Sequence, residues 1–310
     1  MGLVFQPALC MLRPLMRLVR DIYAEKAASG QPVISFEFFP PKTVEGDRIL
    51  LEKTIPALMQ AHPDYCSVTY GAGGSTRDKT LMIVERIQNQ HGLTAVAHLT
   101  CVASTREEIR DLLRQIRAIG VRNVLALRGD PPPGQEFKPT PGGFEYSNQL
   151  VEFIRSEDHF SIGVAGFPEG HIACKEGKIV DWAHLSRKIE AGADFVITQL
   201  FFDNADYYSF RDHMTRQHNI RVPIVPGVIP ILSGAQIKRF TALCGASIPS
   251  RLAERLNSLG DDDAAAAEFG IEYATEQCRD LLRNGAPGIH FYTLNKAHST
   301  LRILRNLNLG

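Results

Sequence analysis

The sequence lacks the cysteine patterns that mark disulfide frameworks and zinc sites. Its 310 residues include six cysteines, and no two of them form a CxxC pair. Cys66 and Cys101 lie in apolar runs typical of strands, where a thiol packs as a small hydrophobic group. We therefore expect no disulfide framework and no metal site, and a reducing, cytoplasmic location suits the chain best.

An excess of one charge and a long hydrophobic run are also missing. Lys plus Arg and Asp plus Glu both number 34, so no overall basic field is available for nucleic acid. No stretch of about 18 apolar residues is present, which argues against a membrane span. Hydrophobic residues make up 44% of the chain, enough for a large packed core.

The N-terminus does not have the order of a signal peptide. Its basic residues Arg13, Arg17 and Arg20 follow apolar residues, whereas a signal peptide begins with the basic residues. We expect residues 1–30 to form an N-terminal extension with a helix, or the true start to lie at Met11 or Met16. The catalytic domain is expected over residues 31–310.

Several catalytic motifs are absent, namely the P-loop, HExxH and GxSxG. The turn at residues 71–76, Gly-Ala-Gly-Gly-Ser-Thr, follows an expected strand and precedes an expected helix, as a dinucleotide-binding turn does. Its sixth position is Thr76 rather than Gly or Ala. An ordinary loop between strand and helix is therefore the favoured interpretation.

What the sequence does have is a regular alternation of strand and helix patterns. Short apolar runs typical of buried parallel strands occupy residues 32–38, 65–70, 93–100, 123–127, 161–165, 194–199, 223–227 and 288–293. Helical patterns follow them near residues 47–60, 78–90, 105–119, 147–155, 182–191, 205–216, 235–284 and 297–306. The clearest helix has a possible capping box, Thr105 with Glu108, and ends at Gly120. Eight such units without a linker predict one α/β domain, a (β/α)8 TIM barrel.

The active site of such a barrel lies at the carboxyl ends of the strands. Polar and aromatic residues at or just after these ends are the candidates: Glu37, Thr69, His98, Thr100, Arg128, Asp130, Phe167, Glu169, His171, Gln199, Tyr292, Asn295 and Lys296.

Glu37 is the most informative candidate, because it sits in an apolar strand between aromatic residues. Burial would raise the pKa of its carboxyl group and keep it protonated, as a general acid requires. A salt bridge to an Arg or Lys of a neighbouring strand is the equally supported alternative.

Two other candidates also have structural interpretations. Gly129, between Arg128 and Asp130, would let a ligand approach the backbone, but the same residues fit a turn with an ion pair. His98 interrupts an apolar strand, where a histidine is often only a hydrogen-bonded core residue.

Taken together, these segments closely resemble the methylenetetrahydrofolate reductase family, in its bacterial type that consists of the catalytic barrel. The matching motifs run in order over about residues 30–308: Ser-Phe-Glu-Phe-Phe-Pro-Pro (35–41), Ser-Val-Thr-Tyr-Gly-Ala (67–72), His-Leu-Thr-Cys (98–101), Ala-Leu-Arg-Gly-Asp-Pro-Pro (126–132), Ile-Thr-Gln-Leu-Phe-Phe-Asp (197–203), Pro-Gly-Val-Ile-Pro (226–230) and His-Phe-Tyr-Thr-Leu-Asn (290–295). Seven ordered motifs favour the functional interpretation of Glu37, His98 and Asp130.

The resemblance implies bound FAD and a ping-pong reduction of methylenetetrahydrofolate by NADH or NADPH. Glu37 would be the acid that opens the methylene bridge, and Asp130 would lie near the flavin ring and touch the folate. Gln199, Tyr292 and Lys296 would contact folate or nicotinamide. The implied FAD-binding residues are Thr69, His98, Leu127, Arg128, Gly129, Asp130, Tyr146, Ser147, Phe167, His171, Asp181, Arg187 and Lys188.

The chain departs from the family pattern at three positions. Phe167 stands where some members have Tyr, and Lys296 stands where Arg is common, which reduces a bidentate contact to a point charge. Gly234 aligns near an aromatic residue that stacks on the nicotinamide, which puts the electron donor in doubt. The sequence ends at Gly310 without the regulatory domain of animal members, so we expect no such regulation.

Three alternatives stay open beside the family's reaction. A barrel enzyme with another organic cofactor, or with none, would act on a phosphorylated or pterin-like substrate and would be colourless. A barrel without catalysis would serve as a subunit of a larger redox complex. An active variant would take its electrons from a partner protein. The resemblance also suggests a homo-oligomer.

Overall fold

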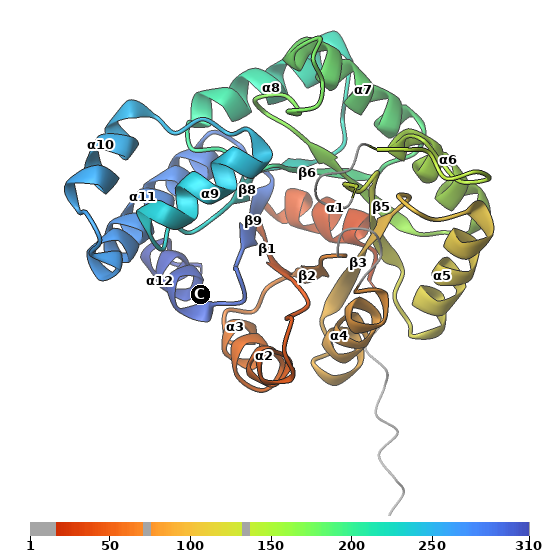
Figure 1. Ribbon diagram of the computed structural model, residues 1–310, viewed down its shortest axis with the longest axis horizontal. Coiled ribbons are helices and arrows are strands. Elements are labelled where there is room, and N and C mark those ends of the chain that lie inside the picture. Colours follow the sequence, from red (N-terminus) through yellow and green to blue (C-terminus); the bar gives the residue numbers. More distant parts are fainter. Residues whose placement is uncertain (1–16, 71–75, 132–136, 310) are drawn as a thin grey trace, which may run out of the picture.

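The computed structural model describes residues 17–70, 76–131 and 137–309 (Figure 1). The glycine-rich turn at residues 71–74 and the alternative starts Met11 and Met16 lie outside these residues. The predictions made for them therefore stay predictions.

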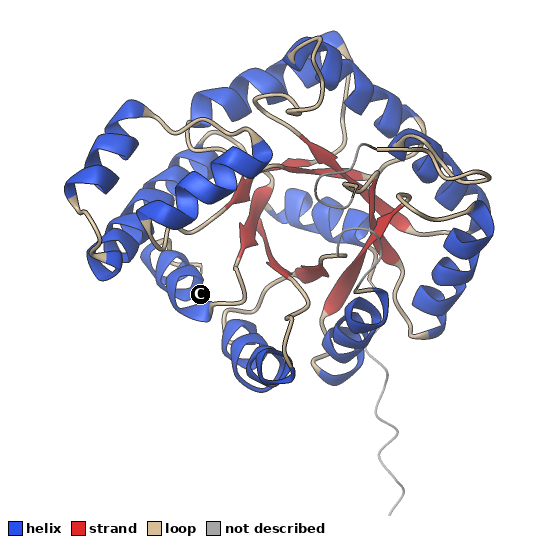
Figure 2. Ribbon diagram, in the orientation of Figure 1, coloured by secondary structure: helices blue, strands red, loops and turns tan. Residues whose placement is uncertain are grey.

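The strands form a closed ring surrounded by helices, which confirms the predicted TIM barrel (Figure 2). Every pairing is parallel. The strands are β1 Val33–Phe38, β2 Tyr65–Val68, β3 Thr94–Thr100, β4 Asn123–Leu127, β5 Ser161–Gly166, β6 Phe195–Thr198, β7 Ile224–Val225, β8 Gly227–Val228 and β9 Gly288–Tyr292. Their order around the ring is β7-β6-β5-β4-β3-β2-β1-β9-β8.

The seventh strand of the barrel was predicted as one run over residues 223–227, and the structure divides it into β7 and β8. Pro226 lies between the two parts and has no N–H to donate to a neighbouring strand. Its carbonyl still accepts a hydrogen bond from the amide of His290 at 3.0 Å. Because β7 pairs with β6 and β8 pairs with β9, this broken strand closes the ring.

The helices cover the outside of the ring, as Figure 2 shows. They are α1 Val19–Ser29, α2 Val44–Ile49, α3 Ile55–Met59, α4 Arg77–Gln90, α5 Arg106–Ala118, α6 Ser147–Glu157, α7 Lys178–Glu190, α8 Asn204–Gln217, α9 Gly234–Cys244, α10 Ser250–Ser258, α11 Asp263–Arg283 and α12 Ala297–Asn306, with a π-helical turn at Leu50–Thr54. The capping box of Thr105 and Glu108 at the start of α5 is confirmed. Within the described residues, every helix is too short or too polar to cross a membrane.

The helical stretch predicted over residues 235–284 is three helices rather than one. The first, α9, ends at Gly245, which has a left-handed φ of +78°, and Pro249 precedes α10. A second left-handed glycine, Gly260, separates α10 from α11. Together with residues that follow β6 and β8, these three helices form a second apolar cluster beside the barrel core.

Helix α1 closes the amino-terminal end of the barrel. The amide of Val19 donates to Oδ1 of Asn123 at the start of β4, and the amide of Arg20 donates to Oγ of Ser161 at the start of β5. Tyr23 enters the barrel interior, where its hydroxyl lies 3.0 Å from the hydroxyl of Tyr65. With this end filled, the carboxyl ends of the strands are left to form the site.

Candidate functional site

The carboxylate of Glu37 lies inside the barrel near the end of β1, and its side chain is only 16% exposed. One of its oxygens, Oε2, receives all of the polar contacts described here. Nε2 of His98 lies 3.3 Å away without hydrogen-bond alignment, and Nε2 of His290 lies 3.5 Å away. Ser67 donates to the same oxygen at 3.4 Å. The site thus brings together residues from β1, β2, β3 and β9.

The prediction that burial keeps Glu37 protonated is wrong. Burial does raise the pKa of this carboxyl group, but the positive charge of His98 and the hydrogen bond from His290 outweigh burial and lower the pKa to about 2. The alternative of an Arg or Lys partner is also wrong, because the side chains beside the carboxylate are histidines. Without a bound substrate, the structure therefore favours the ionised carboxylate.

Sequence analysis missed Ser67 and His290, two of the side chains that contact Glu37. His290 is fully buried, and its Nδ1 lies 2.8 Å from Oγ of Ser35. The strand register places Ser35 beside His290, two residues before Glu37 and therefore on the same face of β1. A polar residue at every second position of an otherwise apolar strand was the available signal.

Gly129 lies where only glycine fits. Its φ is +84°, and a Cβ atom there would lie 2.5 Å from Val102 and 2.9 Å from Thr100. The turn places Arg128 with its guanidinium 4.8 Å from the ring centre of Phe137, and Asp130 is exposed beside it. Gly129 therefore keeps the chain close to the end of β3.

A second polar group lies between β5 and α7. The amide of His171 donates to Oδ2 of Asp181 at 3.1 Å, and the ring of His171 meets that of Phe167 edge-on. Lys188 donates to the carbonyl of Ala165 at 3.2 Å. Burial lowers the pKa of Lys188, the charge of Asp181 opposes that shift, and the charge of Arg128 adds to it.

The remaining predicted residues differ in exposure. Arg187 is exposed on α7, and within the described residues no contact joins its side chain to this group. Thr69 and Leu127 are half-buried at strand ends, whereas Tyr146 and Ser147 lie at the start of α6, the first exposed and the second buried.

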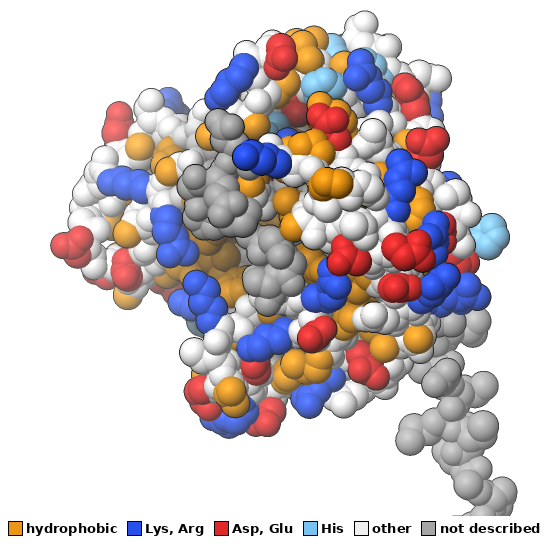
Figure 3. Space-filling view, turned by 45° about the vertical axis from the view of Figure 1, so that its right-hand side comes forward, with side chains coloured by type: hydrophobic (Ala, Val, Ile, Leu, Met, Phe, Trp, Pro, Cys, Tyr) orange, Lys and Arg blue, Asp and Glu red, His pale blue; other side chains and the backbone are white. Residues whose placement is uncertain are grey.

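The predicted substrate residues lie on the β6 and β9 side of the barrel. Gln199 and Phe167 line one small pocket together with Leu200. The hydroxyl of Tyr292 donates to the carbonyl of Thr198 at 2.6 Å, while Lys296 is exposed. Figure 3 shows a hollow with hydrophobic walls on one face of the molecule, with Lys and Arg side chains around it.

Comparisons with known proteins agree with this architecture. A family model described as methylenetetrahydrofolate reductase matches residues 22–308. In Arabidopsis thaliana, methylenetetrahydrofolate reductase (NADH) 1 is 43% identical over 291 residues, which are 90% of this chain and 49% of the relative. The chain thus spans about half the length of this plant protein.

A bacterial relative matches over almost its whole length. The 5,10-methylenetetrahydrofolate reductase of Escherichia coli is 38% identical over 280 residues, 90% of this chain and 92% of the relative. A solved structure from Clostridium thermocellum, described as an uncharacterized protein that binds two copies of 5-methyl-5,6,7,8-tetrahydrofolic acid, shares the fold with a TM-score of 0.62 at 17% identity. That alignment covers 92% of this chain and 97% of the other. On the family model and the bacterial relative, this chain belongs to the methylenetetrahydrofolate reductase family.

Proposed function

We propose that this protein reduces methylenetetrahydrofolate to methyltetrahydrofolate, with bound FAD and with NADH or NADPH as the reductant in a ping-pong cycle. The observation that carries the proposal is the Glu37 carboxylate held between His98 and His290 in the barrel of a family member. The reaction needs a proton donor beside the folate, and this cluster places a carboxyl group and two imidazoles together near the carboxyl ends of the strands.

The residues at these strand ends fit a flavin dinucleotide. Lys188 is a half-buried cation whose described hydrogen bond goes to a neutral carbonyl, and Arg128 adds a second positive charge near it. Together they would neutralise a diphosphate. The Oγ1 of Thr100, buried next to Gly129, has no hydrogen-bond partner within the described residues. When bound, FAD would accept a hydride from the nicotinamide and pass it to the folate.

Glu37 would act by supplying a proton to one of the two folate nitrogens that the methylene bridge joins. Protonation of this nitrogen lets its bond to the bridging carbon break, and the electrons of the other folate nitrogen then form the iminium that accepts hydride. Because the pKa of Glu37 lies at about 2 in the free protein, the bound folate must raise it. Exclusion of water by the folate would do so, since burial already pushes this pKa upward.

Other residues would orient the substrates. Gln199 lies in a pocket beside Phe167 and would hydrogen-bond the folate or the nicotinamide. The exposed Lys296 would attract the folate's carboxylates as a point charge. We also propose that the protein is cytoplasmic, since each of the five described cysteines is a free thiol. A homo-oligomer is proposed only on the resemblance to the family.

The test is the visible spectrum of the purified protein before and after anaerobic addition of NADH or NADPH. We expect the bands of oxidised flavin, and we expect one of the two nucleotides to bleach them. A colourless protein that FAD cannot reconstitute would overturn the proposal.

One observation favours a second candidate, in which a partner protein supplies the electrons. Gly234 is at the start of α9, and a Cβ atom there would have no neighbour within 4 Å. The position thus has room for the aromatic side chain expected to stack on the nicotinamide, but glycine does not supply one. Flavin bands that bleach with dithionite but with neither nucleotide would support this candidate.

A further inference from the structure

The barrel has a seam where its broken seventh strand meets β6. Backbone pairing joins β7 to β6 through Ile224 and Val225, whereas β8 pairs with β9 instead. Within the described residues, no strand pairing joins β6 to β8. Gln199 follows β6 directly, so the seam ends beside a residue expected to contact the substrates.

We propose that Thr198 and Tyr292 are positioning residues for the folate reduction proposed above. Oγ1 of Thr198 accepts a hydrogen bond from the amide of Gly227 at 2.9 Å, and the hydroxyl of Tyr292 donates to the carbonyl of Thr198 at 2.6 Å. These two hydrogen bonds, the seam bonds, replace the missing backbone pairing and fix the spacing between Glu37 and Gln199. This role rests on the proposed function.

Tyr292 reaches from β9 to β6 over the backbone of β8. A Cβ atom at Gly227 would lie 2.6 Å from the ring of Tyr292 and 2.3 Å from the carbonyl oxygen of Thr198, so only glycine leaves room for this crossing. Burial, with a smaller contribution from the charge of Glu37, raises the pKa of the Tyr292 hydroxyl well above its ordinary value of 10. The hydroxyl therefore keeps its proton and remains a donor.

Thr198 is the residue at which these contacts meet. Its side chain is fully buried and accepts from the amide of Gly227, which is buried as well. The amide of the next residue, Gln199, donates to the carbonyl of Gly166 on β5 at 2.7 Å. The peptide that leads into Gln199 is therefore held from both sides, by β5 and by Tyr292.

The seam bonds also connect Gln199 with Glu37. Tyr292 is the register partner of Glu37 across β1 and β9, and its hydroxyl holds the carbonyl just before Gln199. A shift of about 1 Å between reacting groups can slow a reaction about 10²-fold. The seam bonds would therefore act on the rate of proton transfer to a bound folate rather than on the affinity for it.

The main test is Thr198→Val, which removes the acceptor and keeps the shape of the side chain. Because Thr198 is fully buried, its replacement removes no contact with a substrate. We expect the dithionite-reduced holoenzyme to transfer hydride to saturating methylenetetrahydrofolate about 10- to 100-fold more slowly, with little change in KM. Flavin reduction by the nucleotide should change much less, since only the folate step uses the proton of Glu37. Thr198→Ser keeps the hydroxyl and should restore most of the rate.

Tyr292→Phe breaks the other seam bond and should slow the same step. Added to Thr198→Val, it should cause little further loss, because both bonds hold one seam. Tyr207→Phe is the matched control. This buried tyrosine also donates to a strand carbonyl, that of Ile224 at 2.8 Å, but from α8 on the outside of the ring, so both half-reactions should be unchanged.

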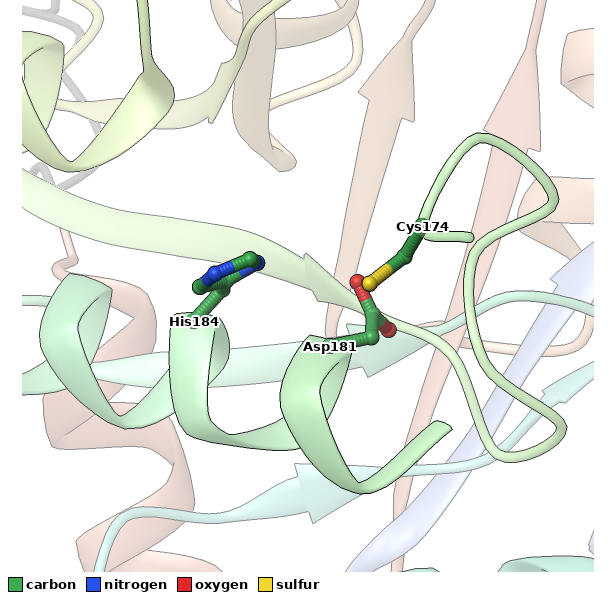
Figure 4. A group of neighbouring side chains, drawn as sticks. All are labelled: Cys174, Asp181 and His184. Atoms are coloured by element: carbon green, nitrogen blue, oxygen red, sulfur yellow. The ribbon is translucent and has the colours of Figure 1, made fainter. Parts of the chain in front are cut away.

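The variants should retain FAD. The proposed flavin site, where Figure 4 shows Cys174, Asp181 and His184 on α7 and the loop before it, contains no residue that forms the seam bonds. FAD content and circular dichroism therefore establish that a slow variant is folded and holds its cofactor.

Hydrogen exchange tests the seam bonds without any reaction. The amide of Gly227 should exchange slowly in the wild type, and Thr198→Val should accelerate its exchange at least about tenfold, whereas Thr198→Ser should not. Unchanged exchange at Gly227 in Thr198→Val would overturn the proposal, and so would a raised KM for folate without a slower maximal rate. A wild type that protects this amide but does not reduce methylenetetrahydrofolate would overturn the proposed function and the positioning role with it, while the seam bonds themselves would stand.

Discussion

Oε2 of Glu37 lies 3.3 Å from Nε2 of His98, although their strands, β1 and β3, are not neighbours in the barrel. The contact reaches across β2, where Ser67 occupies the gap and donates to the same oxygen. The barrel thus places a carboxylate and an imidazole side by side in a mostly buried position. A carboxylate and a protonated imidazole attract each other more strongly there than they would in water.

Replacement of this carboxylate should separate the two halves of the reaction. We expect Glu37→Gln to retain FAD and to oxidise NADH or NADPH, but to reduce methylenetetrahydrofolate about 10²- to 10⁴-fold more slowly, the usual contribution of a general acid. Stopped-flow measurement of each half-reaction checks this. Glu254→Gln, at an exposed position of α10, is the control and should behave as wild type. Normal folate turnover by Glu37→Gln would remove Glu37 as the acid.

The lowered pKa of Glu37 also makes a prediction about stability. A carboxyl group with a pKa near 4.5 when unfolded and about 2 when folded stabilises the protein above pH 4.5, and this stabilisation is lost as the pH falls toward 2. Between about pH 6 and about pH 3, the wild type should lose about 2 kcal/mol more unfolding free energy than Glu37→Gln. Urea denaturation at the two pH values measures the difference, and equal losses would contradict the lowered pKa.

Two glycines provide a matched test of the turn after β4. Gly129 and Gly142 both have a left-handed φ, +84° and +75°, but only at Gly129 would a Cβ atom collide with neighbouring atoms. Gly142→Ala should cost about 1 kcal/mol for the backbone alone, whereas Gly129→Ala should cost roughly 1–3 kcal/mol more through crowding. Urea denaturation and retention of FAD on gel filtration check both variants. Equal effects would mean that crowding at Gly129 is unimportant.

Adjacent basic residues on α7 test the proposed flavin site. Lys188 is directed to the strand end at Ala165, while Arg187 is exposed. Lys188→Gln should weaken FAD binding about 10- to 100-fold, as expected for the loss of a charge-assisted hydrogen bond. Arg187→Gln should have a much smaller effect, since an exposed charge contributes little. Equilibrium titration of the stripped protein with FAD measures both. A larger loss in Arg187→Gln than in Lys188→Gln would support the FAD-binding role that the family resemblance implies for Arg187.

Much of the barrel could be predicted from the sequence, because each strand is a short apolar run and each helix has its own boundary signals. The bounds of β4 and α12 agree with prediction. The division of residues 235–284 into three helices was missed, although Gly245, Pro249 and Gly260 mark the breaks. The apolar pattern there continues across those residues, since all three helices pack against one cluster.

The candidate site was predictable only in part. Glu37 and His98 stood out as polar residues in apolar strands, and the structure brings them together. Their mutual effect could not be predicted, because the sign of the Glu37 pKa shift depends on which side chains cross the barrel.

The contacts of helix α1 affect the order in which parts of the protein fold during synthesis. Its partners Asn123 and Ser161 follow it in the chain by 104 and 141 residues, and Arg20 also approaches Asp194. On the ribosome, this first helix must therefore wait until more than half of the barrel has been synthesised. Contacts so distant in sequence form slowly, so the segment that emerges first should be among the last to reach its place.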